Sequence, residues 1–325
     1  MDIDVAALIQ VGLYVALVLG LIVGILLLAG GLTWVERRVL ALFQDRYGPN
    51  RVGPAGLLQV LADMIKLFWK EDWVAPFADK TVFVIAPLFI VIFTIMSFAF
   101  VRWSPGTAVA DLNVGLLFFL GMSSMSVYSV ALGGWSANNK YALIGSMRAI
   151  GQMISYEVFM GLSLMGVVMM AGSFSLGAIV RAQEKMWFCV PQIVGLIVFL
   201  LAGLAETRRI PFDLPEAENE LVAGYHSEYS GMKFAMFFMG EYIGVALIST
   251  LLVVLFFGGW LGPILPGVWW FLLKVGIAIV GFVLIRGSLP RPRYDQLMAV
   301  GWRVLLPLSL VNLVVTAALV LSTGS

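Results

Sequence analysis

Residues 206–229 read ETRRIPFDLPEAENELVAGYHSEY and lie between two long apolar stretches of the chain. This segment holds six of the nineteen acidic residues and the single histidine, His226. Pro211 and Pro215 break any helix that would continue from the preceding apolar stretch. The segment is therefore predicted to be a loop between two membrane-spanning helices, and its concentration of carboxylates requires an explanation.

The composition of the 325-residue chain indicates an integral membrane protein. Hydrophobic residues make up 61% and charged residues 12%, whereas soluble globular proteins carry roughly 25% charged residues. Several apolar stretches are about 20 residues long, enough for a helix to cross a bilayer core of roughly 30 Å. They are continuously apolar rather than alternating, which argues against a β-barrel. We expect an all-α polytopic membrane protein.

Eight transmembrane helices are predicted, and no soluble stretch is long enough to stand apart, so residues 1–325 should form a single integral membrane domain. The predicted spans are about 8–33, 82–101, 113–134, 152–171, 189–205, 234–257, 268–286 and 302–321. The segments on one side hold sixteen of the twenty Lys and Arg residues. Because positive charge favours the cytoplasmic side, both termini are expected on the opposite, periplasmic side. The acidic N-terminus does not predict a cleaved signal peptide.

Residues 56–70, GLLQVLADMIKLFWK, predict an amphipathic helix that does not span the membrane. Its polar residues recur at steps of four, three and four, which places them on one stripe of a helix. The stretch is too short and too charged to cross a bilayer. A helix lying along the cytoplasmic interface and a surface helix packed on the spans fit the pattern equally well.

Three classes of function and site are excluded by the residue counts. The net charge is +1, which gives no support to nucleic-acid binding. Cys189 is the single cysteine, so neither an intrachain disulfide nor an all-cysteine iron–sulfur site can form within the chain. One histidine cannot supply bis-histidine haem ligation. We therefore predict no metal site and no redox cofactor in this chain; any redox cofactor belongs to a partner or arrives as a diffusible substrate.

Three ionisable residues fall within predicted spans: Glu157, Glu241 and Lys274. A charge at the bilayer centre costs roughly 2.5–3.5 kcal/mol even on lenient scales, and such residues usually face a bundle interior or water. A helix-packing hydrogen bond or a Glu–Lys pair is the structural alternative. Because two glutamates recur in separate spans, each next to a tyrosine, we favour proton exchange.

The loop carboxylates have a local explanation and a functional one. Asp213 can cap a new helix with Glu216 three residues later, where the helix dipole favours negative charge. A solvated loop would be the ordinary account of such a charge run. The prolines and the interspersed apolar residues instead favour a packed loop, whose carboxylates titrate as a coupled set and are candidate proton relays.

Four long motifs carry a resemblance that covers essentially the whole chain. They are ERRVLALFQDRYGPNRVGPAGLLQVLADMIKLFWKED at 36–72, SANNKYALIGSMRAIGQMISYEV at 136–158, ETRRIPFDLPEAENELVAGYHSEYSGMKFAMFFMGEY at 206–242 and SLPRPRYDQLMAVGWRVLLPLSLVN at 288–312. Together they resemble the H subunit of respiratory complex I, the proton-translocating NADH:quinone oxidoreductase, whose mitochondrial counterpart is NADH dehydrogenase subunit 1. Position 208 is arginine where that family usually has asparagine, and position 60 is valine where proline is common.

The resemblance implies a membrane subunit at the junction of the two arms of that complex, with part of its bundle resembling an antiporter half-channel. It implies a quinone chamber and buried carboxylates that link quinone reduction to proton translocation. The quinone is a substrate, while FMN and iron–sulfur clusters belong to partner subunits. The chain would have no catalytic residue of its own, and its partners would be peripheral-arm subunits, membrane-arm subunits and lipid. From acidic termini on the outer side and the absence of a transit peptide, we expect a bacterial inner membrane.

The family's site residues map onto this sequence as two groups. The quinone-chamber group is Glu36, Arg37, Arg46, Asp63, Lys66 and Glu228. The proton-relay group is Glu157, Asp213, Glu216, Glu218, Glu220 and Glu241.

Two other classes of function fit parts of the sequence. One is the membrane anchor of an energy-converting hydrogenase or formate hydrogenlyase, which is homologous to this family and can lack quinone. The unbroken GPNRVGPAGLLQ and PFDLPEAENELVAGYHSEY stretches favour the quinone enzyme over it. The other is an independent ion or metabolite transporter, which would account for the buried charges and should work without partners.

Overall fold

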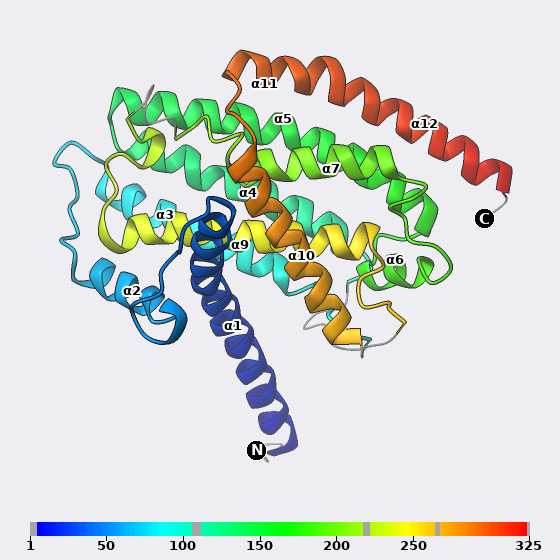
Figure 1. Cartoon of the computed structure of the whole chain (residues 1–325), viewed down its shortest axis with the longest axis horizontal. Coiled ribbons are helices and arrows are strands. Elements are labelled where there is room, and N and C mark those ends of the chain that lie inside the picture. The colour runs from blue at the N-terminus through cyan, green and yellow to red at the C-terminus, as the bar shows by residue number, and fades with distance from the viewer. Residues whose placement is uncertain (1–4, 106–111, 217–221, 264–266, 324–325) are drawn as a thin grey trace.

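The computed structural model describes residues 5–105, 112–216, 222–263 and 267–323, and every regular element within these residues is a helix (Figure 1). The long helices are α1 (Val5–Phe43), α3 (Lys80–Phe98), α4 (Gly115–Ser136), α5 (Lys140–Ala171), α7 (Ile193–Glu206), α9 (Gly231–Phe256), α10 (Gly267–Ser288) and α12 (Leu306–Thr323). Shorter ones are α2 (Gln59–Trp69), α6 (Leu176–Ala182) and α11 (Tyr294–Val300), with single turns at 54–56 and 224–226 and a π turn at 301–305.

The predicted all-α membrane architecture is confirmed, with eight apolar helices close to the eight predicted spans. Seven of the helices in the described residues are long and apolar enough to cross a membrane. The eighth, α7, has 14 residues; at about 1.5 Å per residue it is roughly 21 Å long, shorter than a bilayer core of roughly 30 Å.

At two predicted spans, one end lies far from the end of the corresponding helix. The span predicted at 8–33 continues as α1 to Phe43, and the one predicted at 152–171 begins as α5 at Lys140. Both extensions carry charged residues, such as Arg37 and Arg148. Hydropathy detects only the apolar part of each helix, whereas the backbone hydrogen bonding continues into the polar turns. The last predicted span, 302–321, begins in the π turn that joins α11 to α12.

Helix α9 is the centre of the bundle and positions the buried site. It passes through the middle of the molecule and packs against α1, α3, α7 and α10 (Figure 1). Most of its residues are buried, including Glu241. A helix that is apolar on nearly every side is expected in this position because it has neighbours all round.

The amphipathic helix forms as predicted, with bounds of 59–69 rather than 56–70. It packs against α1 and α9, yet none of its residues is buried. Leu61, Ile65 and Trp69 remain exposed on its outer side. The two alternatives are therefore compatible: the helix is packed on the spans and still presents an apolar face.

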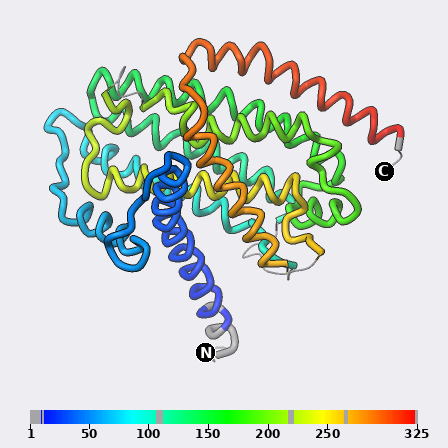
Figure 2. Tube along the Cα trace, viewed as in Figure 1, coloured from blue at the N-terminus to red at the C-terminus, as the bar shows by residue number. Residues whose placement is uncertain are grey.

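The C-terminal helix is tied to the bundle by a polar contact among apolar side chains. Gln192 Nε2 donates to Thr316 Oγ1 at 2.6 Å, and Asn312 Nδ2 donates to Gln192 Oε1 at 2.8 Å. Such interhelical bonds contribute on the order of 1 kcal/mol each in membranes. They fix α12 along α5 and α7, the arrangement visible along the upper edge of Figure 2.

Lys274 has a structural role. Its ammonium group donates to the carbonyl oxygens of Phe257, Gly259 and Leu261, at 2.6, 3.1 and 2.7 Å. These carbonyls follow the end of α9, where a cation interacts favourably with the helix dipole.

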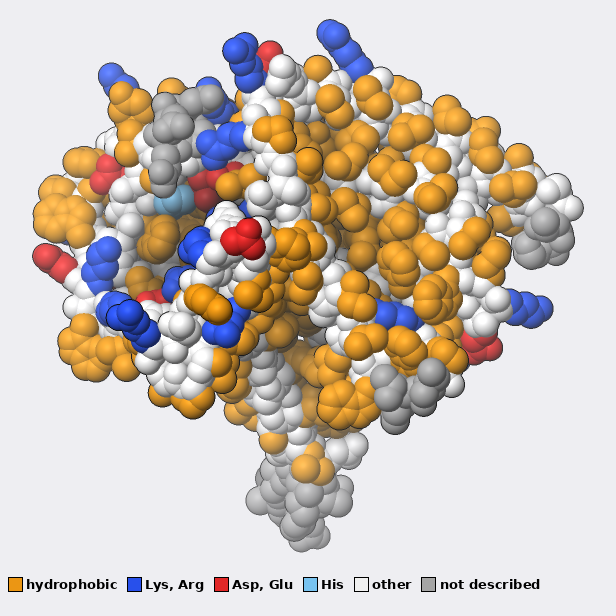
Figure 3. Space-filling view, in the orientation of Figure 1, with side chains coloured by type: hydrophobic (Ala, Val, Ile, Leu, Met, Phe, Trp, Pro, Cys, Tyr) orange, Lys and Arg blue, Asp and Glu red, His pale blue; other side chains and the backbone are white. Residues whose placement is uncertain are grey.

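Most charged side chains on the face visible in Figure 3 lie over the end of the bundle that holds α2 and the acidic loop.

Candidate functional site

The start of the acidic loop is held in place by one glutamine. Gln152 of α5 is fully buried, and its Nε2 donates to the carbonyls of Ala205 at 2.8 Å and Phe212 at 2.9 Å. These two hydrogen bonds connect α5 to both ends of the turn that follows α7. The turn therefore carries Arg208 and Arg209 into the protein interior, where they are 2% and 8% exposed.

Arg209 connects two buried glutamates on different helices. Its Nη1 lies 3.0 and 3.2 Å from the two carboxylate oxygens of Glu36 on α1, and its Nε lies 3.9 Å from Glu241 Oε2 on α9. Arg286 of α10 forms a second ion pair with Glu36. The guanidinium of Arg209 also stacks 4.1 Å from the centre of the Tyr242 ring. Removing one partner of such a buried pair typically costs about 3–5 kcal/mol, because the other charge is left uncompensated.

Arg208 extends this network to the acidic loop through a tyrosine. Arg208 Nη1 donates to Tyr225 Oη at 2.6 Å, and the same hydroxyl can donate to Glu216 at 2.9 Å or to Glu241 at 3.4 Å. Burial raises the pKa of Tyr225 well above its ordinary value, so the hydroxyl keeps its proton. His226 Nδ1 lies 3.7 Å from Glu216. We call Glu36, Arg208, Arg209, Tyr225 and Glu241 the buried charge chain.

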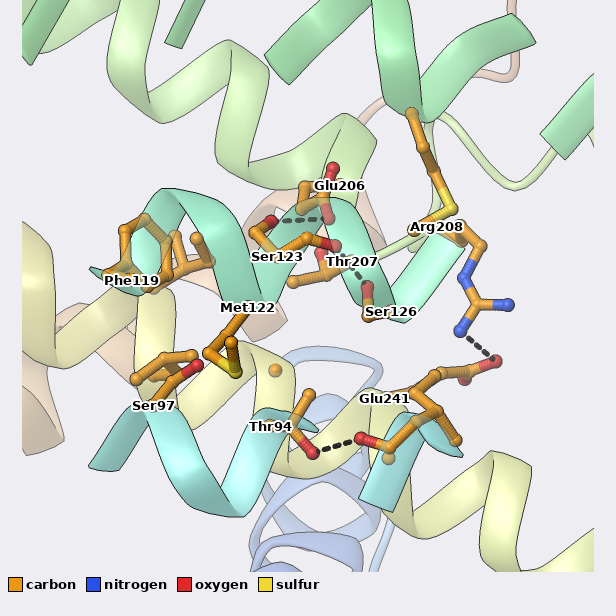
Figure 4. A pocket seen from close by; sticks show the side chains of 16 residues that line it. Thr94, Ser97, Phe119, Met122, Ser123, Ser126, Glu206, Thr207, Arg208 and Glu241 are labelled. Atoms are coloured by element: carbon orange, nitrogen blue, oxygen red, sulfur yellow. Dashed lines mark hydrogen bonds and ion pairs between the residues drawn. The ribbon is translucent and has the colours of Figure 1, made fainter. Parts of the chain in front are cut away.

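A second pair of glutamates lies across a small cavity from this chain. Glu206, at the end of α7, accepts a hydrogen bond from Ser123 at 2.8 Å. Ser124, the next residue of α4, donates to Glu157 of α5. The cavity has a volume of about 40 Å³ and is lined by Glu206, Arg208 and Glu241 together with hydroxyl groups (Figure 4). A water molecule needs roughly 10–15 Å³ of such volume, so the cavity has room for a few.

Two further cavities share Arg37 as a lining residue. One has a volume of about 100 Å³ and lies between α1, α2 and α9, with apolar side chains such as Val60, Met64 and Met239. The other has a volume of about 530 Å³ and is lined by Glu36, Arg46, Tyr242 and Arg286 among others. Arg37 and Phe238 line both, so the two cavities are adjacent. We call the first the apolar passage and the second the polar chamber.

Asp63 fixes the side chain of Arg37 at the junction of these cavities. Arg37 Nη1 donates to Asp63 Oδ2 at 2.6 Å, and Gln59 Nε2 donates to Asp63 Oδ1 at 2.9 Å. Burial by itself raises the pKa of Asp63, but the hydrogen bonds from Arg37 and Gln59, together with the charges of Arg37 and Lys66, leave this pKa below its ordinary value. Lys66 lies 3.6 Å from the same carboxylate. The group therefore remains an anion that positions two cations.

The structure brings together most, but not all, of the residues predicted from the sequence. Glu36, Arg37 and Arg46 line the 530 Å³ chamber. Glu228 lines neither it nor the apolar passage, and instead accepts a hydrogen bond from Asn139 at 2.7 Å. The placement of Glu218 and Glu220, and of any helix capped by Asp213, lies outside the described residues.

Several residues of the site were missed in the sequence. Arg209, Arg286, Tyr225 and Glu206 form its contacts, and none was predicted to have a role. The sequence did contain a signal for residues 206–209, ETRR. Four polar residues that directly follow a span end lie where the chain turns back toward the bundle. Within the described residues, no group of three or more His, Cys, Asp and Glu residues could hold a metal ion.

These features define a polytopic helical membrane protein with a polar chamber at one end and a buried chain of charges beside it. Residues 15–317 match the NADH dehydrogenase family. The chain is also 57% identical over 308 residues to the H subunit of the NADH-quinone oxidoreductase of Methylococcus capsulatus, in an alignment that covers 94% of this chain and 98% of the relative. The chain therefore belongs to the NADH dehydrogenase family, as its resemblance to the H subunit of complex I predicted.

Asp213 provides a test of the loop's anchoring to the α10–α11 connection. Its carboxylate pairs with Arg291 at 2.6 Å, and burial raises its pKa from 3.8 to about 6, against the lowering effect of Arg291. Because the folded state binds this proton more tightly than the unfolded state, the wild type should lose stability relative to Asp213→Asn as the pH rises from 3.8 to about 6. Thermal unfolding of the purified protein against pH measures this difference, with Asp295→Asn, at an exposed carboxylate on α11, as the control. A difference that is constant or of opposite sign across that window contradicts the assignment.

Proposed function

We propose that this chain is the H subunit of a proton-translocating NADH:quinone oxidoreductase, in which it forms the quinone chamber and passes the consequence of quinone reduction to buried carboxylates. The observation that carries the proposal is one residue, Glu36. It lines the polar chamber and is at the same time the ion-pair partner of Arg209, which contacts Glu241. A change of charge in the chamber therefore acts directly on the ion pairs of the buried charge chain.

The quinone reaches the chamber through the apolar passage between α1, α2 and α9. Its isoprenoid tail matches the Met, Leu and Phe side chains of that passage, and its polar head matches the chamber beyond Arg37. Asp63 and Lys66 hold the junction in a fixed geometry. The redox chemistry comes from the quinone and from FMN and iron–sulfur clusters in partner subunits, while this chain binds and orients the substrate.

The proton route runs from the chamber along the buried charge chain to the cavity and then to Glu157. Carboxyl groups and hydroxyls can accept and release protons, and the cavity between Glu241 and Glu206 is lined by the hydroxyls of Thr94, Ser97 and Ser126. Ser123 and Ser124, adjacent on α4, contact Glu206 and Glu157 respectively. Charges interact over longer distances in such an interior than in water, so one protonation event influences the next.

The same proposal places the chain in a bacterial inner membrane. The N-terminal end of α1 and the C-terminal end of α12 lie toward the periplasm, and the acidic loop lies toward the cytoplasm. The excess of Lys and Arg in the segments that share the side of the loop supports this orientation. Partner subunits of the complex cover the chamber from the cytoplasmic side, and membrane-arm subunits cover exposed apolar helix faces. An independent transporter would also account for the buried charges, but the similarity to an NADH-quinone oxidoreductase subunit over 94% of this chain favours the complex.

The passage can be tested by narrowing it. Val60 lines the passage, and Val60→Trp should raise KM for a quinone with a long isoprenoid tail by about tenfold while changing KM for a short-tailed analogue much less, because only the long tail must occupy the passage. Steady-state kinetics of the assembled complex with both quinones measure the effect. The matched control is Leu61→Trp, on the exposed side of the same helix. Equal changes for both quinones, or none, contradict this route.

The proton route can be tested at its two intramembrane acids. Glu157→Gln and Glu241→Gln remove a titratable proton while keeping size and hydrogen bonding. Each variant should lower the number of protons pumped per NADH oxidised by at least about twofold in reconstituted vesicles. Assembly of the complex, checked by gel filtration, serves as the control for folding. Wild-type pumping in both variants would exclude these residues from the route.

A further inference from the structure

Arg208 is a buried arginine in a backbone conformation that arginine rarely adopts. It follows the end of α7 by two residues, has φ of 52° and is 2% exposed. Positive φ is uncommon outside glycine, asparagine and aspartate, and for a long side chain it marks local strain. The fold therefore holds a cation at a position where a smaller residue would be less strained. The backbone conformation does not explain an arginine here, so its charge is the feature to account for.

Arg208 interacts with carboxylates that come from two different helices. Its Nη2 is 4.0 Å from Glu241 Oε1 on α9, and it lines the cavity that Glu206 of α7 also lines (Figure 4). Arg208 interacts electrostatically with both. It is the one Lys or Arg among the described residues that line this cavity.

Within the described residues, Glu241 is the one carboxylate that forms an ion pair with Arg208. Tyr225 accepts its Nη1 proton, and Tyr225 has a single proton to donate to Glu216 or Glu241. Glu216 interacts electrostatically with Arg208, and its hydrogen-bonded connection to the guanidinium runs through this hydroxyl. Arg209, on the other side of Glu241, has Glu36 as its own partner. Besides Glu241, Glu206 is the carboxyl group among the described residues that lines this cavity together with Arg208.

We propose that Arg208 is a shared counter-ion that makes the protonation of Glu241 and Glu206 interdependent. A proton that binds the Glu241 carboxylate leaves the Arg208 charge uncompensated. The Glu206 carboxyl then releases its proton into the cavity, and its carboxylate, which accepts the Ser123 hydrogen bond, replaces Glu241 as the counter-ion. One proton enters and one leaves, so the net charge around the cavity stays constant, which avoids the cost of an unpaired charge in a low-dielectric interior.

Other charged and titratable groups surround both glutamates and enter the titration. Those that face Glu241 are Arg208, Arg209, Tyr225, Glu216 and, farther away, Asp213. Those that face Glu206 are Ser123, Glu157 and Arg208. Of the residues that the structure describes, Arg208 alone belongs to both sets. A guanidinium does not itself exchange protons at physiological pH, so Arg208 acts as a positioning residue through its charge.

This inference rests on the proposed proton route, and its test separates the two. The complex is reconstituted in liposomes, and proton pumping is measured against pH for Arg208→Asn and Arg208→Lys, with Arg181→Gln, an exposed arginine on α6, as the matched control. Without the cation both carboxylates are harder to ionise, so Arg208→Asn should move the carboxylate limb of the profile to higher pH by about one unit, a tenfold change in proton affinity. Arg208→Lys keeps the charge and should stay close to wild type.

The decisive comparison adds Glu206→Gln. With Arg208 present, Glu206→Gln leaves Glu241 as the only direct counter-ion and should move the profile to lower pH; in the Arg208→Asn background this shift should disappear. An unchanged profile for Arg208→Asn, or an equal shift for Arg208→Lys, overturns the proposal while leaving the proton route intact. Wild-type pumping in both Glu206→Gln and Glu241→Gln overturns both. If Arg208→Asn does not assemble, Glu206→Gln is measured in the Arg208→Lys background instead. A shift of the pH profile equal to the one seen with Arg208 supports the shared charge, and no shift contradicts it.

Discussion

The structure depends on the pairing of two consecutive arginines that cannot lose their charge. Arg208 and Arg209 are buried beside the membrane-spanning helices, and a guanidinium stays protonated at any physiological pH. Each therefore needs a carboxylate or a strong hydrogen-bond acceptor within reach. Glu36 on α1 and Glu241 on α9 provide this, and Arg286 on α10 shares Glu36. The ion pairs thus hold three helices and the loop in one arrangement.

The same pairing joins two regions that would otherwise be separate. Glu36 lines the polar chamber, which is adjacent to the apolar passage, and Glu241 lines the small polar cavity. Only one arginine separates the two glutamates. In the function proposed here, a change of charge on the quinone side alters the balance at Arg209 and hence at Glu241, with no large movement of any helix required. Tyr225 and Arg208 connect that balance to the carboxylates of the acidic loop.

The helices were largely predictable from the sequence, because continuous apolar runs identify membrane helices of this length. The errors lie where helices continue beyond the apolar run, as in the polar ends of α1 and α5, and at α7, which is shorter than a span. The amphipathic helix was predicted from its period, but the side it turns toward Arg37 was not. Lys274 was correctly predicted to lie within a span, and its three carbonyl partners show a structural reason for it.

The site was predictable only in part, because its partners are far apart in the chain. Glu36 and Arg209 are separated by 173 residues, and no local spacing reveals such a pair. Family motifs identified Glu36 and Glu241 but gave no contact between them. The carboxylates of the loop drew attention for their number, whereas in the structure the arginines beside them decide which carboxylates act together. Glu206 was counted among the acidic residues of the loop but was given no role of its own, yet it lines the cavity.

The central claim is that Glu36 and Glu241 work as one unit through Arg209. A double-mutant cycle on proton pumping tests it directly, using Glu36→Gln, Glu241→Gln and the combined variant in the reconstituted complex. If the two residues act through the same arginine, their effects should be non-additive by at least about 1 kcal/mol, the range seen for residues in one ion-pair network. Effects that add to within about 0.5 kcal/mol, the behaviour of independent sites, would contradict the account.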